Sequence, residues 1–230
     1  MSKRDIIQEI LAKKDSTNSN SRLTTFINRE KSLNDSFIFL LEHENDTSLT
    51  LNKELSRYYP IALASIVEGY FRAAIVDLIN LGLPYSERAG NLVKDLKIQI
   101  SVFAKMQSKK ITLGEYVSHH INISSLDDVN SSMTCLLDMK FIEHLTTAVF
   151  DVFDQEEPIT LNDTKKEFIL AIKDLFKIRH KLCHEFAEDI SIDNSEYLRF
   201  AIAVKSLIGL TEFILWAEES KEQKDIKIRI

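Results

Sequence analysis

The amino-acid sequence predicts an all-α fold, from its composition and from the spacing of its apolar residues. The 230 residues include only 5 Gly and 3 Pro, too few for the many turns of a β fold. Hydrophobic residues make up 44% of the chain and charged residues 28%, which is typical of soluble globular proteins. Apolar side chains recur at helical spacing along most of the chain. We therefore expect a helical bundle with extra N-terminal and mid-chain helices.

The chain divides into three parts. Residues 4–13 carry four apolar side chains at helical spacing and predict an amphipathic helix, too short to be stable alone. It must therefore pack on this chain or on a partner, and the polar run after it predicts a linker. We assign residues 1–21 to this helix and linker, 22–220 to one helical domain and 221–230 to a charged tail.

The middle of the chain predicts a series of helices around one central helix. Residues 58–81 are apolar nearly all round, as in the central helix of a bundle, and Gly82 and Pro84 end this segment. Thr112 and Glu115 have the spacing of a capping box, which predicts that a short helix starts there. The other helices are expected over residues 23–42, 85–107, 125–138, 140–153 and 195–217, with a polar loop at 43–52.

Composition and spacing also bear on localisation and on cofactors. Cys135 and Cys183 lie far apart without metal-ligand spacing, which suits a reducing cytosol. We find neither a signal peptide nor a run of about 18 apolar residues, so a cytoplasmic protein without a membrane segment is expected. His119 and His120 are adjacent and would point ~100° apart on a helix, so one metal could not bind both. No metal or cofactor is expected.

The segment at 164–186 contains the most unusual chemistry. Thr164 and Glu167 have capping-box spacing, so a helix is expected to begin there. Its apolar residues fall in one arc, and Arg179 lies in the middle of that arc, where a helix normally carries Leu or Ile. A buried arginine is unfavourable unless it is paired. We therefore expect Arg179 to have a specific partner.

Glu68, on the predicted central helix, is the candidate partner. It could pair with Arg72, one turn away on the same helix. It could instead receive Arg179 and orient its guanidinium group. Both interpretations are open on the sequence alone.

A basic strip follows one flank of the same predicted helix. Its members are Lys173, Lys177, His180, Lys181 and His184. The net charge of the chain is −6, so any contact with RNA must use a local patch of this kind. Histidine transfers protons near neutral pH, and arginine binds phosphate through two hydrogen bonds.

The run Arg179-His180-Lys181-Leu182-Cys183-His184 fits R-x4-H with a polar residue after the arginine, and in this it resembles the HEPN superfamily. The resemblance implies a HEPN-like helical bundle, usually dimeric, and a metal-independent endoribonuclease of a prokaryotic toxin or antiviral defence system. It implies cleavage to 2′,3′-cyclic phosphate and 5′-hydroxyl ends, with Arg179, His184 and His180 as catalytic residues, Glu68 in support, and Lys173, Lys177 and Lys181 binding RNA. It further implies a homodimer, and an antitoxin or other defence-system protein as partner. The alternative is a non-catalytic HEPN module that binds nucleotides or proteins.

The geometry of a helix separates the two principal residues of this motif. Arg179 and His184 differ by about 7.5 Å in rise and by about 140° in direction, which does not suit a single phosphate in one subunit. A dimer would bring a second Arg179 and a second His184 to the same cleft. The apolar surface of residues 195–217 covers more than one face of that helix, as a twofold interface would require.

Overall fold

The computed structural model describes residues 6–16, 21–43, 49–94, 100–147, 162–185 and 192–228. Every regular element within these ranges is an α-helix, so the all-α prediction is confirmed. The helices are α1 (Ile6–Ser16), α2 (Arg22–Glu42), α3 (Leu49–Asn80), α4 (Tyr85–Leu92), α5 (Ile100–Ser108), α6 (Leu113–His120), α7 (Leu126–Leu137), α8 (Phe141–Thr147), α9 (Asn162–His184) and α10 (Asn194–Ile228).

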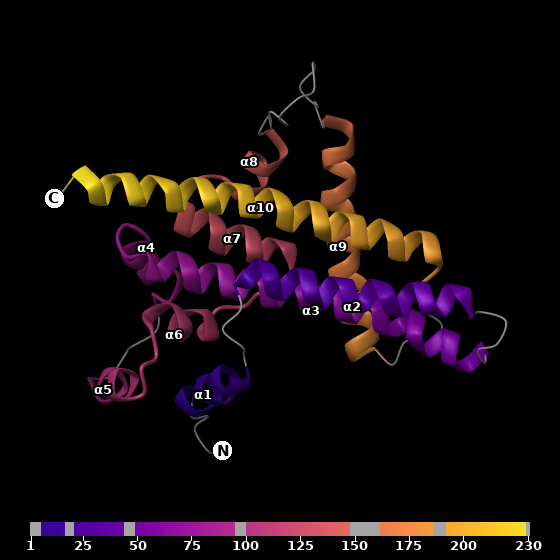
Figure 1. Ribbon diagram of the computed structural model, residues 1–230, viewed down its shortest axis with the longest axis horizontal. Helices are drawn as coiled ribbons and strands as arrows, with labels where there is room; N and C mark the ends of the chain where they lie inside the picture. The colour runs from indigo at the N-terminus through magenta and orange to yellow at the C-terminus, as the bar shows by residue number, and fades with distance from the viewer. Residues whose placement is uncertain are drawn as a thin grey trace.

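The central helix of the fold is α3. Helices α2, α4, α6, α7, α9 and α10 all pack against it. Figure 1 shows α2, α3 and α10 running along the long axis of the molecule, while α9 crosses them. The expectation that the segment at 58–81 lies at the centre of a bundle is therefore confirmed.

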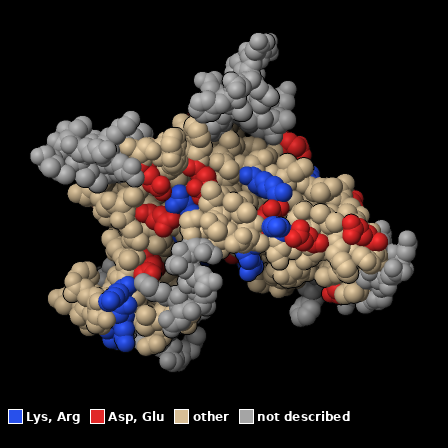
Figure 2. Space-filling view, viewed as in Figure 1, with Lys and Arg blue, Asp and Glu red and all other residues tan. Residues whose placement is uncertain are grey.

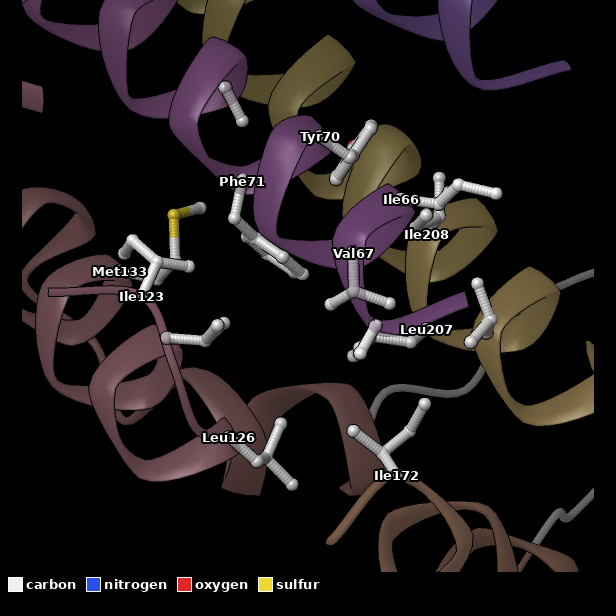
Figure 3. Packing of buried hydrophobic residues seen from close by; sticks show 14 of the residues in the cluster. Ile66, Val67, Tyr70, Phe71, Ile123, Leu126, Met133, Ile172, Leu207 and Ile208 are labelled. Atoms are coloured by element: carbon white, nitrogen blue, oxygen red, sulfur yellow. The ribbon is translucent and has the colours of Figure 1, made fainter. Parts of the chain in front are cut away.

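The main hydrophobic core surrounds α3. Val67 and Phe71 of α3 have no exposed surface. In Figure 3, Phe71 points toward Met133 of α7, and Val67 points toward Leu207 of α10 and Ile172 of α9. Burying each such side chain contributes about 1.5–3 kcal/mol. The apolar circumference of α3 thus determines where its neighbours pack.

An arginine at the first residue of α2 connects α2 to α3 and α10. Arg22 donates from Nη1 to Asp77 Oδ2 of α3 at 2.6 Å, from Nε to Glu212 Oε1 of α10 at 2.8 Å, and from Nη2 to Glu219 at 3.2 Å. Burial alone would lower the pKa of Arg22, but the hydrogen bonds to Glu212 and Asp77 outweigh it and raise that pKa. The Arg22 side chain is only 11% exposed, so these carboxylates compensate the desolvation of its charge.

The N-terminal helix packs on the same chain, in a smaller second core. This core lies between α1, α5 and α6, at the lower left of Figure 1, and its buried members are Ile7, Ile10, Met106, Ile111 and Tyr116. The amphipathic helix expected at 4–13 is confirmed within the described residues, from Ile6 onward. Because its apolar face covers α6, α1 does not need a partner protein for its stability.

The two adjacent histidines belong to this second core. His119 Nε2 lies 2.9 Å from Glu9 Oε2 and so links α6 to α1. The His120 ring packs 4.7 Å from the Tyr116 ring, and burial, together with His119, lowers the pKa of His120. Thr112 forms the expected capping box with Glu115 at the start of α6.

Several helix boundaries differ from the expected ones. Helix α3 begins at Leu49, so residues 49–52 of the loop expected at 43–52 are helical, while residues 44–48 lie outside the described part. Pro60 is typical of a first turn because it lacks an N–H, yet here it lies inside α3. The adjacent Tyr59 ring packs 5.4 Å from Phe37 of α2. This packing accounts for a helix that continues through a proline.

The helix boundaries also differ from the expected ones in the segments at 85–107 and 221–228. The segment at 85–107 contains two helices, because α4 ends at Leu92, where Val93 has a φ of −128°. The segment at 221–228, expected as a charged tail, continues α10, since Lys, Glu and Gln are strong helix formers. Helix α8 is separate from α7. Residues 148–153 of the segment expected at 140–153, and residue 186 of the segment expected at 164–186, lie outside the described residues.

Part of α10 has the length and composition of a membrane span. Asn194–Ser220 contains an 18-residue window with a mean hydropathy of 1.7, and half of this window is buried inside the fold. A buried core helix satisfies the same criteria. The absence of a membrane segment therefore stays a prediction from the sequence.

The ion pairs of Arg22 lead to a stability prediction. Arg22→Ala should lower the free energy of unfolding by about 2–3 kcal/mol, because it leaves three carboxylates, one of α3 and two of α10, without the cation that they share. The measurement is urea unfolding followed by circular dichroism. Lys140→Ala is the control, since Lys140 is 80% exposed in its pair with Glu143, and it should change stability far less than Arg22→Ala does. Equal effects of the two substitutions would contradict the role of Arg22.

Candidate functional site

Helix α9 carries the candidate site and is fixed by packing on one side. Ala171, Ile172, Leu175 and Phe176 form its buried face, and the helix contacts α3, α7, α8 and α10. It begins at Asn162, so Thr164 lies inside the helix rather than at its cap. The expected partner of Thr164, Glu167, instead accepts a hydrogen bond from Arg199 of α10 at 3.1 Å.

Arg179 contacts Glu68 across the α9–α3 interface, as one of the two open interpretations predicted. Arg179 Nη2 lies 3.1 Å from Glu68 Oε1, and the two side chains are 23% and 20% exposed. The competing partner, Arg72, instead donates to the backbone oxygens of Ser118 at 2.6 Å and Ile121 at 3.2 Å. The Glu68–Arg72 pair is therefore excluded by this geometry.

The Arg179–Glu68 contact is an ion pair with little hydrogen bonding. Arg179 Nε and Glu68 Oε1 are both buried and make no hydrogen bond. A buried donor without a partner costs about 1–3 kcal/mol. Arg179 is thus held in the interface by charge and packing, while part of its side chain stays exposed.

Most of the basic strip lies on another face of α9. Lys173, Lys177, His180 and Lys181 line a groove of about 540 Å³ between α9 and the start of α7. His184 is exposed, and its ring centroid lies 4.9 Å from that of His180 at an angle of 47°. The two imidazoles therefore stand side by side at the C-terminal end of the strip.

The opposite wall of this groove is partly acidic. It consists of the turn into α7, where Ser125 caps the helix by accepting a hydrogen bond from the N–H of Asp128. Asp127 lines the groove, and its carboxylate lies 3.9 Å from Lys173 Nζ. Glu185 lines the other end. The cationic surface is therefore concentrated on the α9 side.

Arg179 and the basic strip occupy different faces of α9 within one chain. Arg179 does not line the groove, and its guanidinium group points to Glu68 of α3. This is the separation expected from their angular spacing on a helix. One subunit therefore brings His180, His184 and the lysines together, but not Arg179.

The chemistry available in this groove is proton transfer and anion binding by side chains. Among the described residues, no group of three or more His, Cys, Asp or Glu side chains could hold a metal ion. Lysines bind phosphate as point charges, and imidazoles can donate or accept a proton near neutral pH. A polyanion with a labile ester is the kind of ligand for which these groups are suited.

The described residues on the face shown in Figure 2 do not form a large basic surface. On the face in Figure 2, Asp and Glu side chains are interspersed with Lys and Arg, and a group of basic residues lies over α5. This view agrees with the net charge of −6. Binding of a nucleic acid would therefore depend on a narrow strip rather than on the whole surface.

Sequence reasoning missed the residues that complete the site from other elements. Ser124, Ser125 and Asp127 form the second wall of the groove, and Arg199 holds α9 to α10 through Asp174 at 2.9 Å and Glu167. Only the N-cap pattern of Ser125 is visible in the sequence. It predicts the start of α7, but not that this start lies beside α9.

Comparison with models of protein families, with curated proteins and with solved structures finds no match. The resemblance to the HEPN superfamily, based on the R-x4-H run, therefore stays a prediction.

The Glu68–Arg179 pair should contribute more to stability than the Asp138–Arg88 pair, which has a similar length but is more exposed. Glu68→Gln should reduce the free energy of unfolding by about 1–3 kcal/mol, because it leaves a partly buried guanidinium group without its anion. Asp138→Asn is the matched control: its pair with Arg88 is 3.2 Å long, but Asp138 is 78% exposed. That substitution should cost less than about 1 kcal/mol. A double-mutant cycle with Arg179→Gln measures the coupling, and coupling near zero would contradict the pair.

Proposed function

We propose that this chain is a metal-independent endoribonuclease that cuts RNA to 2′,3′-cyclic phosphate and 5′-hydroxyl ends. The observation that carries the proposal is the pair of exposed imidazoles, His180 and His184, at the end of a lysine-lined groove. A basic groove on a chain of net charge −6 indicates an anionic ligand. RNA is a polyanion whose phosphate ester reacts by proton transfer, so it suits both the lysines and the imidazoles.

The proposed reaction requires two proton transfers at one phosphate. His184 accepts the proton of the 2′-hydroxyl while the 2′-oxygen forms its bond to phosphorus. The bond from phosphorus to the 5′-oxygen then breaks, and a second imidazole donates a proton to the leaving oxygen. His180 lies close enough to His184 to orient the phosphate or to share this proton transfer. Lys173, Lys177 and Lys181 would hold the flanking phosphates.

Arg179 would stabilise the charge that develops on the phosphorane. Because its guanidinium group lies on another face of α9 than His184, the proposal includes a homodimer in which two Arg179–His184 sets share one cleft. The toxin or antiviral setting, and an antitoxin or defence-system partner, belong to this proposal only through the resemblance to the HEPN superfamily.

The exposed apolar stripe of α10 supports the dimer. Ile202 is 63% exposed and Trp216 is 65% exposed. Both lie seven residues from Gly209, where an added β-carbon would meet nothing within 4 Å in this chain. Two antiparallel copies of α10 that cross at Gly209 would therefore place each Ile202 against a tryptophan, as a self-complementary twofold contact requires. An apolar groove of about 530 Å³ between α9 and α10 lies beside this stripe.

A second candidate function is a non-catalytic nucleotide- or protein-binding module. The position of Arg179 favours it, because the guanidinium group contacts Glu68 in the α9–α3 interface. In that case the arginine stabilises the fold, and the basic strip binds its ligand without cleaving it. Cleavage assays separate the two functions.

The proposed chemistry predicts RNA cleavage in the presence of EDTA. His184→Ala should lower kcat by at least about 100-fold, the usual contribution of a positioned acid or base. His144→Ala on α8 is the control, since His144 is also exposed but lies outside the groove. Lys177→Glu should mainly raise KM and reduce the salt dependence of binding. Products are identified by their cyclic phosphate ends.

Arg179→Ala tests the phosphate-stabilising role separately from folding. It should lower kcat while the far-ultraviolet spectrum stays that of a folded helical protein. Cleavage that needs an added divalent metal, or a folded His184→Ala variant as fast as the wild type, would refute the mechanism. Binding of RNA without any cleavage would favour the second candidate.

The dimer predicts a mass of about 53 kDa in light scattering at micromolar concentration, twice the 26.5 kDa of one chain. Gly209→Leu should convert it to monomer, because the new side chain separates the two helices. The same change should stabilise the monomer by about 1 kcal/mol, since glycine is a poor helix former. Ile100→Glu is the control, because Ile100 is 89% exposed on α5. If the wild-type protein is a monomer, the proposed dimer and its shared cleft are wrong.

A further inference from the structure

His180 and His184 are four residues apart on α9, so their side chains differ by only about 40° in direction around this helix. The chain has six histidines, and no other two of them have this spacing. Both side chains are exposed, and their ring centroids lie 4.9 Å apart at an interplanar angle of 47°. Helix α9 therefore presents two neighbouring imidazoles to solvent on one side.

The separation of the two rings is close to that of two imidazoles on one metal ion. Metal–nitrogen bonds about 2.0–2.1 Å long that diverge at a tetrahedral angle place the centres of two imidazoles about 5 Å apart. Two histidines four residues apart on one helix face are a recurrent pair of zinc ligands. The interplanar angle of 47° is too large for parallel stacking, so stacking does not account for the contact.

The other neighbouring histidines of the chain show the contrast. His119 and His120 are adjacent in α6, and their ring centroids lie 6.3 Å apart at an angle of 88°. His119 Nε2 already contacts Glu9 Oε2 of α1 at 2.9 Å, and His120 Nε2 is buried. These two histidines are therefore unsuited to share one ion, whereas the pair on α9 has both the spacing and the exposure.

The charges around the pair on α9 act in opposite directions on a cation. Lys177 and Lys181 each lie three residues before one of the two histidines and repel a cation. His184, however, is the last residue of α9, and the unpaired carbonyl groups at the end of a helix favour positive charge. The exposed Glu185 follows directly. Since Lys177 is exposed, its repulsion is screened by water and salt. The lysines thus weaken coordination by the imidazoles without preventing it.

We propose that His180 and His184 together bind one divalent transition-metal ion per chain, with Zn²⁺ as its occupant. Imidazole suits zinc, copper and nickel, whereas Mg²⁺ and Ca²⁺ prefer oxygen ligands. Water completes the coordination, because no third His, Cys, Asp or Glu joins the pair among the described residues. A site with two protein ligands binds more weakly than a structural zinc site, so its occupancy follows the concentration of free zinc.

The consequence for activity rests on the proposed ribonuclease function. An imidazole whose basic nitrogen is bonded to zinc cannot accept the proton of the 2′-hydroxyl. The proposed cleavage needs no metal, so the bound ion acts only as an inhibitor, and a chelator restores the activity. The metal site itself does not depend on whether the chain cleaves RNA.

Calorimetry with Zn²⁺ on the full chain, without an affinity tag, measures the site directly. We expect one ion per chain. His180→Ala and His184→Ala should each weaken zinc binding at least about tenfold, because two ligands on one rigid helix act together. His144→Ala on α8 is the control and should leave the affinity unchanged. The proposal is overturned if zinc shows no saturable binding below millimolar concentration, or if both α9 variants bind it as the wild type does.

Cys183 is the alternative ligand, because it lies between the two histidines in the sequence and is exposed. Cys183→Ser should leave the zinc affinity unchanged. Co²⁺ bound in place of Zn²⁺ should show no charge-transfer absorption from a thiolate. Loss of zinc binding in this variant would contradict the assignment to the imidazoles.

Cleavage assays separate the metal site from the proposed function. Zinc should slow RNA cleavage over the same concentrations at which it binds the chain, and EDTA should restore the rate. If zinc binds and cleavage continues at the same rate, inhibition through this site is wrong. If no RNA is cut with or without EDTA while zinc binding still depends on both histidines, the ribonuclease proposal fails and the metal site stands.

Discussion

The structure depends on α3, a helix that buries apolar side chains around most of its circumference. Ile66, Phe71 and Ile79 are 7% exposed or less, although their positions in the sequence place them on different sides of this helix. A helix of this kind is stable only when neighbours cover it on every side. Six of the other helices do so. The position of α9, and with it the candidate site, is therefore set by the need to cover α3.

The same constraint determines where the charges of α3 find partners. Glu68, Arg72 and Asp77 lie on one helix that is otherwise apolar over this stretch, and each contacts a different element. Glu68 contacts Arg179 of α9, Arg72 the backbone oxygens at the end of α6, and Asp77 the first residue of α2. Since partly buried charges are costly without partners, these contacts favour one arrangement of the three neighbours over others.

Patterns within one helix were readable from the sequence, and contacts between helices were not. The core face of α9 and the capping box of Thr112 depend on residues a few positions apart. The capping box is confirmed, and the core face is confirmed up to Phe176, whereas Cys183 near the end of α9 is exposed. The interior position of Pro60 depends on packing of its neighbours against α2, which no local pattern reports. Asp127 lies beside Lys173 for the same reason, because only the fold brings α7 to α9.

The two polar partners proposed for Glu68 illustrate this limit. Arg72 and Arg179 were equally compatible with the sequence, because both could reach a carboxylate on the central helix. The structure separates them, since Arg72 is already satisfied by two backbone oxygens at the end of α6. Among the described residues, the partner of Arg179 is Glu68, at 3.1 Å. An arginine that is held by one anion and whose side chain stays partly exposed can still bind a phosphate, provided that the phosphate approaches from a second copy of the chain. For this reason the proposed chemistry and the proposed dimer depend on each other.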